Sequence, residues 1–254
     1  MNILRTVGMA FALYSRIPMP RLDWESESRK YTLYAFPLVG IAVGIFELLW
    51  LWMSQVLDLH TILTGAVLAA LPIWVTGGIH LDGFCDTADA LASHQDTEKK
   101  LQILKDPHMG AFAAIWLGCY FIAQLALAVT AAQMQADLTA LAFGYCISRS
   151  LSGLAVASFP LAKNSGLAYT FAEYADKKRV RTILSILTVV LCIAVCVFCG
   201  IKGIFVSVAA AATFLYYRFR LIGKFGGLSG DLAGWFVQMC ELFTLAAVVL
   251  TEYL

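Results

Sequence analysis

Long apolar runs separated by short polar segments set the pattern of this chain. A helix needs about 20 mostly apolar residues to cross the hydrocarbon core of a bilayer. Seven runs approach that length: 33–53, 61–79, 110–132, 138–158, 182–200, 203–217 and 232–251. The sixth run is short and is expected to continue toward Ile222. The pattern predicts an all-α fold, a polytopic transmembrane helical bundle with about seven spans.

Positively charged residues gather in alternate connecting segments. Lysine and arginine concentrate in cytoplasmic loops close to the ends of spans. Here they occur before the first span, after the second, after the fourth and before the seventh, whereas the other connections carry only Lys202. Seven spans place all four basic segments on one side, which predicts an N-in, C-out orientation. Residues 1–30, with Arg5 and Trp24, are predicted to form an interfacial helix and a turn.

The composition agrees with a membrane protein. Of 254 residues, 60% are hydrophobic and 14% are charged, and the mean hydropathy is +0.77. Soluble domains have about 45–50% apolar and about 25% charged residues. The net charge of +1 gives no indication of a nucleic-acid partner. No linker divides the chain, so residues 1–254 are expected to form a single integral membrane domain.

Three aspartates follow the second run and carry the clearest chemical signal. If the segment is helical, Asp82, Asp86 and Asp89 share one face, because their spacing is i, i+4 and i+7. No lysine or arginine lies between residues 77 and 94 to offset their repulsion. Carboxylate oxygens are the ligands that Mg²⁺ prefers. We expect these three residues to be catalytic and to hold magnesium; the alternative is a solvated acidic loop.

A glycine-rich turn, residues 226–234, leads into the seventh run on the same predicted side. Its Asp231 is a fourth candidate ligand for the metal. Backbone amides around Ser229 and Gly230 could contact a phosphate group near the start of a helix. The alternative is an ordinary helix N-cap, which favours the same residue types.

Two acids lie inside predicted spans, Glu47 in the first and Glu241 in the seventh. Ionisable residues at membrane depth mark a functional site by default. We therefore include both as candidate ligands of the metal. Arg149, the only arginine inside a predicted span, could bind a substrate phosphate or pair with either acid. A structural buried ion pair is the alternative for this group.

The other candidates for substrate contact lie beside these acids or in the basic segments. His80 adjoins the carboxylates and could orient one of them, and Gly83 permits close approach of a ligand to the backbone. Arg16 and Lys105 could contact phosphate. A solvated position is an equal alternative for Lys105.

Several of these segments together resemble the cobalamin synthase family, also called adenosylcobinamide-GDP ribazoletransferases. The resemblance rests on His80-Leu81-Asp82-Gly83, Asp86-Thr87-Ala88-Asp89-Ala90-Leu91, Lys105-Asp106, Gly110-Ala111-Phe112 and Ser229-Gly230-Asp231. Residues 11–20 and 36–40 also fit, so the similarity spans nearly the whole chain. Cys85 stands where the family usually has alanine, and Pro107-His108 replace a more polar pair.

The resemblance implies an activity that joins adenosylcobinamide-GDP to α-ribazole or its 5′-phosphate. The products would be adenosylcobalamin (vitamin B12 coenzyme) or its 5′-phosphate, and GMP. It implies Mg²⁺ as cofactor, small-molecule substrates, and a multi-pass protein of the bacterial inner membrane. We expect the active site to face the cytoplasm, with Asp89 as the first candidate for the general base.

Two alternatives remain open from the residues alone. The aspartate spacing is also similar to that of membrane CDP-alcohol phosphotransferases, which perform analogous chemistry on other substrates. A cation transporter would use the acids as an ion path. Transport predicts acids distributed through the depth of the bilayer, whereas most acids here fall at one face.

Overall fold

The computed structural model describes residues 3–20, 31–162, 169–170, 173 and 176–254, and every regular element in them is helical. Six helical segments are long and apolar enough to cross a membrane. They are α3 (Thr32–Val56), α7 (Ala111–Gln133), α8 (Thr139–Ser158), α10 (Lys177–Cys199), the continuous segment Ile201–Phe225 and α12 (Gly230–Thr251). The segment Ile201–Phe225 comprises α11 (Ile201–Tyr216), η1 (Tyr217–Leu221) and η2 (Ile222–Phe225). The predicted polytopic all-α bundle is confirmed, as is the extension of the sixth run.

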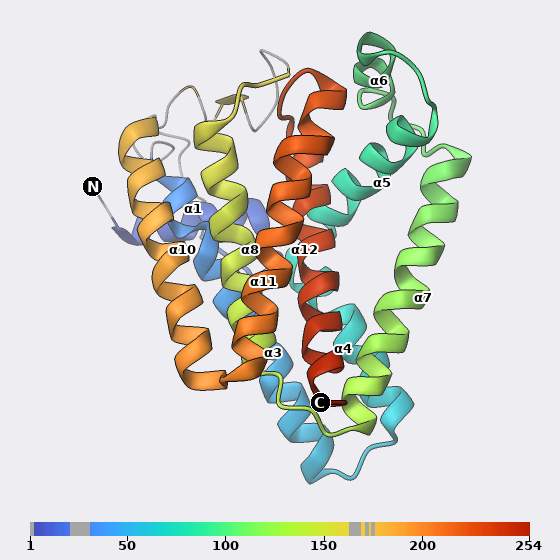
Figure 1. Ribbon diagram of the computed structural model, residues 1–254, viewed down its shortest axis with the longest axis vertical. Coiled ribbons are helices and arrows are strands. Elements are labelled where there is room, and N and C mark those ends of the chain that lie inside the picture. The colour runs from blue at the N-terminus through green and yellow to red at the C-terminus, as the bar shows by residue number, and fades with distance from the viewer. Residues whose placement is uncertain (1–2, 21–30, 163–168, 171–172, 174–175) are drawn as a thin grey trace.

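The second predicted span is a bent pair of helices. α4 (Thr61–Thr76) and α5 (Ile79–Ala92) meet at 96°, and they make a seventh span if counted as one. Gly77 and Gly78 form the corner with φ of 68° and 80°, values that glycine adopts readily. The amide of Gly78 donates to the Ile73 carbonyl at 3.0 Å and closes the end of α4. The run expected to continue to residue 79 therefore ends at Thr76, and α5 runs obliquely toward α7 (Figure 1).

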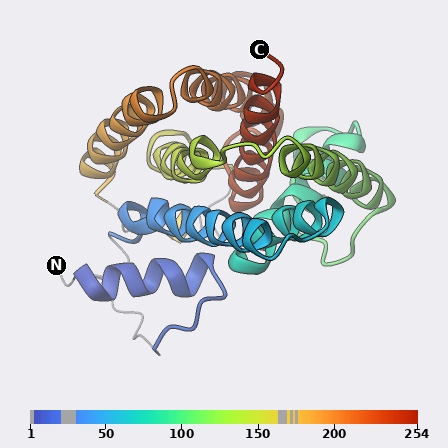
Figure 2. The same cartoon turned by 90° about the horizontal axis from the view of Figure 1, so that it is seen from below.

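Helices α8 and α12 form the interior of the bundle, while α7 and α10 lie at its periphery (Figure 2). α8 packs against α3, α10 and α12, and α12 also packs against α5 and α11. The outer helices expose large apolar side chains such as Val197 and Phe198. An outward apolar surface of this kind is stable in lipid, so the protein is a multi-pass membrane protein.

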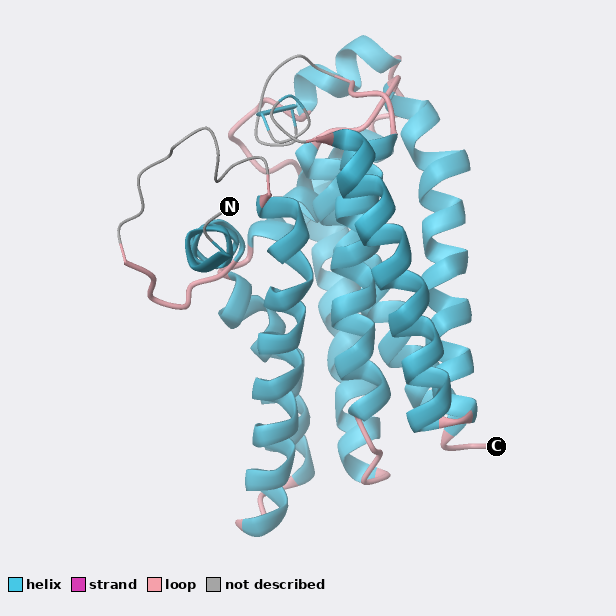
Figure 3. Ribbon diagram, turned by 90° about the vertical axis from the view of Figure 1, so that its left-hand side faces the viewer, coloured by secondary structure: helices cyan, strands magenta, loops and turns pink. Residues whose placement is uncertain are grey.

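The described basic residues gather mainly at the end of the bundle that contains α6 (Thr97–Ile103), the start of α10 and η1 (Figure 1). The C-terminus lies at the opposite end, where Lys202 pairs with Glu252. α1 (Ile3–Tyr14) crosses the side of the bundle against α3 (Figures 2 and 3). The expected N-terminal helix is therefore present. Trp24 lies outside the described residues, and the N-in, C-out orientation stays a prediction.

Candidate active site

The first turns of α5 and α12 meet through two glycines. A methyl group on Gly83 would lie 2.7 Å from the backbone oxygen of Asp231, and one on Gly234 would lie 3.0 Å from the oxygen of His80. These separations are too short for a side chain at Gly83 and tight at Gly234. The glycines therefore allow two helix N-termini to converge. Asp231 comes to lie beside the turn of α5 that carries Asp82.

The three aspartates of α5 occupy one helical face. α5 is helical over Ile79–Ala92, so the i, i+4, i+7 spacing places Asp82, Asp86 and Asp89 in a row. Asp82 is exposed, and Asp86 and Asp89 are half-buried. Phe84 and Ala88, on another face, are buried against neighbouring helices. The sequence pattern thus predicted the row, and the structure adds that it begins at the junction with α12.

Asp89 makes a contact that distinguishes it from the other two. Its Oδ1 accepts a hydrogen bond of 3.3 Å from the amide of Ala113, in the first turn of α7. A side chain at Gly110, the residue before that helix, would collide with the Asp89 carboxylate. The positive end of the α7 dipole stabilises a carboxylate in this place. Asp89 therefore links the end of α5 to the start of α7, and its role as a base stays a prediction.

The start of α12 is a capped helix whose preceding turn is held in place. Ser229 Oγ accepts from the amide of Leu232 at 3.2 Å and lies 3.3 Å from Oδ2 of Asp231. Leu228 exchanges two backbone hydrogen bonds of 2.8 Å with the segment after α8, through Pro160 and Ala162. The helix N-cap that the sequence left open as an alternative is therefore present, and Ser229 forms it. Gly230 is exposed at the same helix start.

The two acids at membrane depth have partners inside the bundle. Glu241 Oε1 lies 2.6 Å from Nη1 of Arg149, and Tyr145 donates to Oε1 of Glu47 at 2.7 Å. All four side chains are buried. The buried ion pair that the sequence left open is therefore present. We call Glu47, Tyr145, Arg149 and Glu241 the mid-bundle polar layer.

This layer is separate from the junction of α5 and α12. Glu241 follows Asp231 by ten residues, which is about 15 Å along a helix. Asp231 and Glu241 are therefore too far apart to bind the same metal ion. The sequence analysis missed Tyr145, although its i, i+4 spacing to Arg149 places both side chains on one face of α8.

His80 faces away from Asp82, whereas Arg16 lies at the corner that leads into α5, so its role as a phosphate contact stays a prediction. His80 is buried, with its ring 6.3 Å from Tyr14 and 5.6 Å from Phe36. It precedes Asp82 by two residues, so the two side chains leave opposite faces of α5, and it does not orient that carboxylate. The amide of Arg16 donates to Val75 at 2.8 Å, and its exposed side chain lies beside the Gly77 corner.

The loop from α6 to α7 places Lys105 at the surface. Asp106 accepts hydrogen bonds from the amide of His108 at 3.0 Å and contacts its Nδ1 at 2.8 Å. These hydrogen bonds hold the pKa of Asp106 below its usual value, and the bond from the backbone amide contributes most. The loop ends at Gly110, against Asp89, so it borders one end of the aspartate row.

The donor chemistry at the junction suits a hard cation. Asp82, Asp86 and Asp231 offer only carboxylate oxygens, the ligand type of Mg²⁺. Among the described residues, no group of three or more His, Cys, Asp or Glu side chains is gathered closely enough to hold a metal. The adjoining helix N-termini add positive dipole ends that favour anions. The arrangement therefore combines oxygen donors with a place for phosphate.

Fold and junction together define a polytopic membrane protein with an acidic site at one end of its bundle. Comparison with known proteins specifies it further, because the Cobalamin-5-phosphate synthase family model matches residues 6–249. The chain belongs to this family. A curated relative from Lachnoclostridium phytofermentans is 39% identical over 252 residues, covering 99% of this chain and 96% of the relative.

Two further relatives also match over nearly the whole chain, at lower identity. A protein from Desulfitobacterium hafniense is 31% identical, with 96% of both chains covered. One from Clostridium perfringens is 29% identical, with 93% of this chain and 94% of the relative covered. All three are named adenosylcobinamide-GDP ribazoletransferase, so the chain is an enzyme of that family. No solved structure matches it significantly.

Proposed function

We propose that this protein joins adenosylcobinamide-GDP to α-ribazole or its 5′-phosphate and releases GMP. The reaction requires Mg²⁺ and takes place where α5 and α12 meet, at the cytoplasmic face of a bacterial inner membrane. Family membership supports the substrates. The contact between Gly83 and Asp231 supports the location, because it brings two acidic helix starts together.

The reaction is a displacement at phosphorus. A ribazole hydroxyl attacks the phosphorus nearest the cobinamide, a new P–O bond forms, and the bond to the GMP oxygen breaks. Enzymes accelerate such transfers mainly by positioning the reactants and by stabilising negative charge. Backbone N–H groups at the starts of α5 and α12 suit the pyrophosphate. Asp89, the carboxylate of the row that the proposed metal set leaves out, is the first candidate to accept the proton of the hydroxyl.

Asp82, Asp86 and Asp231 would hold Mg²⁺ once their carboxylates move closer together than they are in the structure. When bound, the ion would neutralise charge on the pyrophosphate and on the leaving GMP. Glu47 and Glu241 have no place in this set, because their partners Tyr145 and Arg149 hold them in the mid-bundle polar layer. This set is smaller than the six ligands expected from the sequence.

The orientation follows from charge. The basic segments that lie at the junction end would face the cytoplasm by the positive-inside rule. A cysteine placed at exposed Lys99 or at exposed Asp58, on opposite ends of the bundle, reports the orientation in intact cells. Labelling of the Asp58 position alone by an impermeant maleimide supports it, and labelling of the Lys99 position alone overturns it. This experiment uses a chain whose native cysteines are replaced.

The activity is tested with purified protein, Mg²⁺, adenosylcobinamide-GDP and α-ribazole, followed for cobalamin and GMP. Equal amounts of both products are expected, with none when the metal is chelated. Transfer from a CDP-alcohol into lipid without GMP release would favour the phosphotransferase alternative. Metal flux in proteoliposomes without GMP release would favour a transporter.

A further inference from the structure

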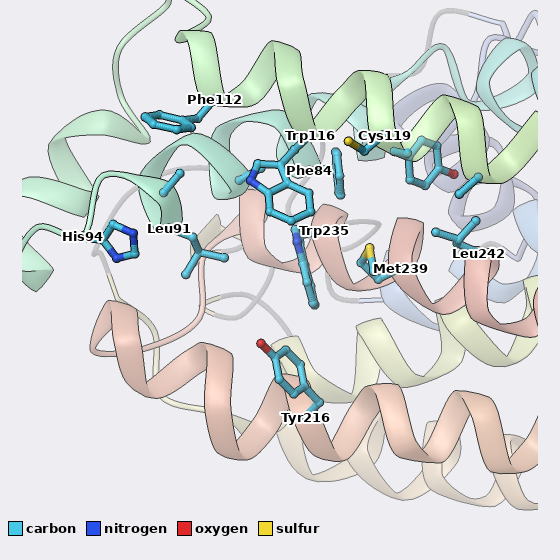
Figure 4. Close-up of a pocket in the computed structure, with 14 residues that line it drawn as sticks. Phe84, Leu91, His94, Phe112, Trp116, Cys119, Tyr216, Trp235, Met239 and Leu242 are labelled. Atoms are coloured by element: carbon cyan, nitrogen blue, oxygen red, sulfur yellow. The ribbon is translucent and has the colours of Figure 1, made fainter.

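An apolar groove lies on the side of α5 away from the aspartate row. It encloses about 670 Å³ between α5, α7 and α12, with Phe84, Ala88, Phe112, Trp116 and Trp235 among its lining residues (Figure 4). Its size falls within the range of about 300–1,000 Å³ typical of ligand sites. Phe84 and Ala88 come from the same helix as Asp82, Asp86 and Asp89. One helix therefore separates the acidic site from this groove.

A second groove joins the first. It encloses about 630 Å³ between α11 and α12, and both grooves are lined by Tyr216, Trp235 and Met239. The rings of Tyr216 and Trp235 lie 6.1 Å apart. The two grooves thus meet at a shared aromatic wall and form a furrow with two branches.

The lining of the furrow suits hydrocarbon. None of the described residues that line either branch is Asp, Glu, Lys or Arg. Trp116 and Tyr216 are 53% and 49% exposed, although they come from helices long enough to span the bilayer. Side chains of this size exposed along spans face lipid rather than water. The furrow therefore opens toward the lipid of the bilayer.

An arginine follows the residues that line one end of the furrow. Arg220 follows Tyr216 by four residues, so it lies about one helical turn closer to the basic end of the bundle. Its side chain is exposed. His94, in the loop after α5, lines the first branch. A negatively charged head group placed here would be attracted to Arg220, while its chains extend along the apolar branches.

We infer that the furrow binds one anionic phospholipid, with an acyl chain in each branch and its phosphate beside Arg220. The two branches match a lipid with two chains, and the cation at one end matches a negative head group. The lipid would pack against α5 from the side opposite the aspartates. This inference concerns a separate surface and does not depend on the reaction proposed above.

Lipid retention measured by native mass spectrometry tests the site. Detergent-purified full-length protein is incubated with dioleoylphosphatidylglycerol, with its lysolipid, or with dioleoylphosphatidylcholine. We expect one retained phosphatidylglycerol per chain and weaker retention of the other two. Arg220→Gln should lower phosphatidylglycerol retention about fivefold, the contribution of one cation to attraction for an anionic lipid. Lys178→Gln, an exposed cation at the start of α10, is the matched control and should change nothing.

Filling the furrow provides a second arm. Ala123→Phe narrows the first branch and Ala212→Phe the second, so each should reduce retention of the two-chain lipid more than that of the lysolipid. Ala126→Phe, at an exposed position of α7 outside the furrow, is the control. Only variants with native elution and helical content are compared. Equal retention of phosphatidylglycerol by the furrow variants and the control variant would overturn the inference. A dimer of the chain that retains no lipid would also overturn it, because a second copy would then cover the furrow.

Discussion

The protein holds carboxylates in two settings that differ in what surrounds them. At the junction, Asp82 is exposed and Asp86 and Asp231 are half-buried, on two helices that are in close contact at Gly83. In the mid-bundle polar layer, Glu47 and Glu241 are buried. Glu47 accepts a hydrogen bond from Tyr145, and Glu241 pairs with Arg149. Burying an acid at membrane depth costs free energy unless a partner compensates. The difference suggests that the junction acids act on substrate, whereas the layer holds helices together.

The strongest test of this division is Asp82→Asn. We expect turnover to fall by at least about a hundredfold, because even residues that merely support metal ligands contribute roughly 10- to 100-fold. The melting temperature should stay near the wild-type value, since Asp82 is exposed. Steady-state GMP release and thermal unfolding in detergent measure the two effects. Asp58→Asn, an exposed aspartate at the other end, should match the wild type.

Breaking the buried pair should give the opposite result. Glu241→Gln leaves Arg149 without its carboxylate, and removing one partner of a buried ion pair destabilises by about 3–5 kcal/mol. The double variant Arg149→Leu, Glu241→Leu should recover much of that loss. Unfolding in mixed micelles measures stability, and turnover per folded molecule should stay near wild type. A Glu241→Gln protein that is fully stable yet inactive would place the chemistry in the layer.

The aspartate row could be predicted from the sequence, but its separation from Glu47 and Glu241 could not, and both outcomes have physical reasons. The spacing of Asp82, Asp86 and Asp89 depends on helix geometry alone, so the row was predictable. The partner of Arg149 depends on how α8 and α12 are rotated against each other, which local patterns do not specify. The bend at Gly77 was missed because the apolar run continues past it. His80 was misplaced because adjacency in sequence was favoured over its angle around the helix.

The close contact at the junction allows a smaller, steric test. Gly83→Ala adds a methyl group 2.7 Å from the backbone oxygen of Asp231, so the two helix starts must separate. Overpacking costs roughly 1–3 kcal/mol, and a shift near 1 Å can lower turnover by about ten- to a hundredfold. Gly118→Ala, where nothing lies within 4 Å of the added methyl, is the control. Equal turnover in both variants would remove the junction from the site.

The smallest effect is expected from Tyr145→Phe. It removes the hydroxyl that donates to Glu47 at 2.7 Å and leaves a buried acceptor unsatisfied, which costs about 1–3 kcal/mol. Thermal unfolding should shift accordingly, while turnover at saturating substrate stays close to wild type. Tyr253→Phe, near the C-terminus and 70% exposed, should leave both unchanged. A large loss of turnover at constant stability would assign the layer a chemical role.

The most direct test of the account is where the divalent cation binds. Mn²⁺ as a paramagnetic substitute for Mg²⁺ can be titrated by electron paramagnetic resonance into the wild type, Asp82→Asn, Asp231→Asn and Glu47→Gln. The account predicts that both aspartate variants weaken binding by at least about tenfold, whereas Glu47→Gln binds like the wild type. Unchanged binding in the aspartate variants, with loss in Glu47→Gln, would contradict it.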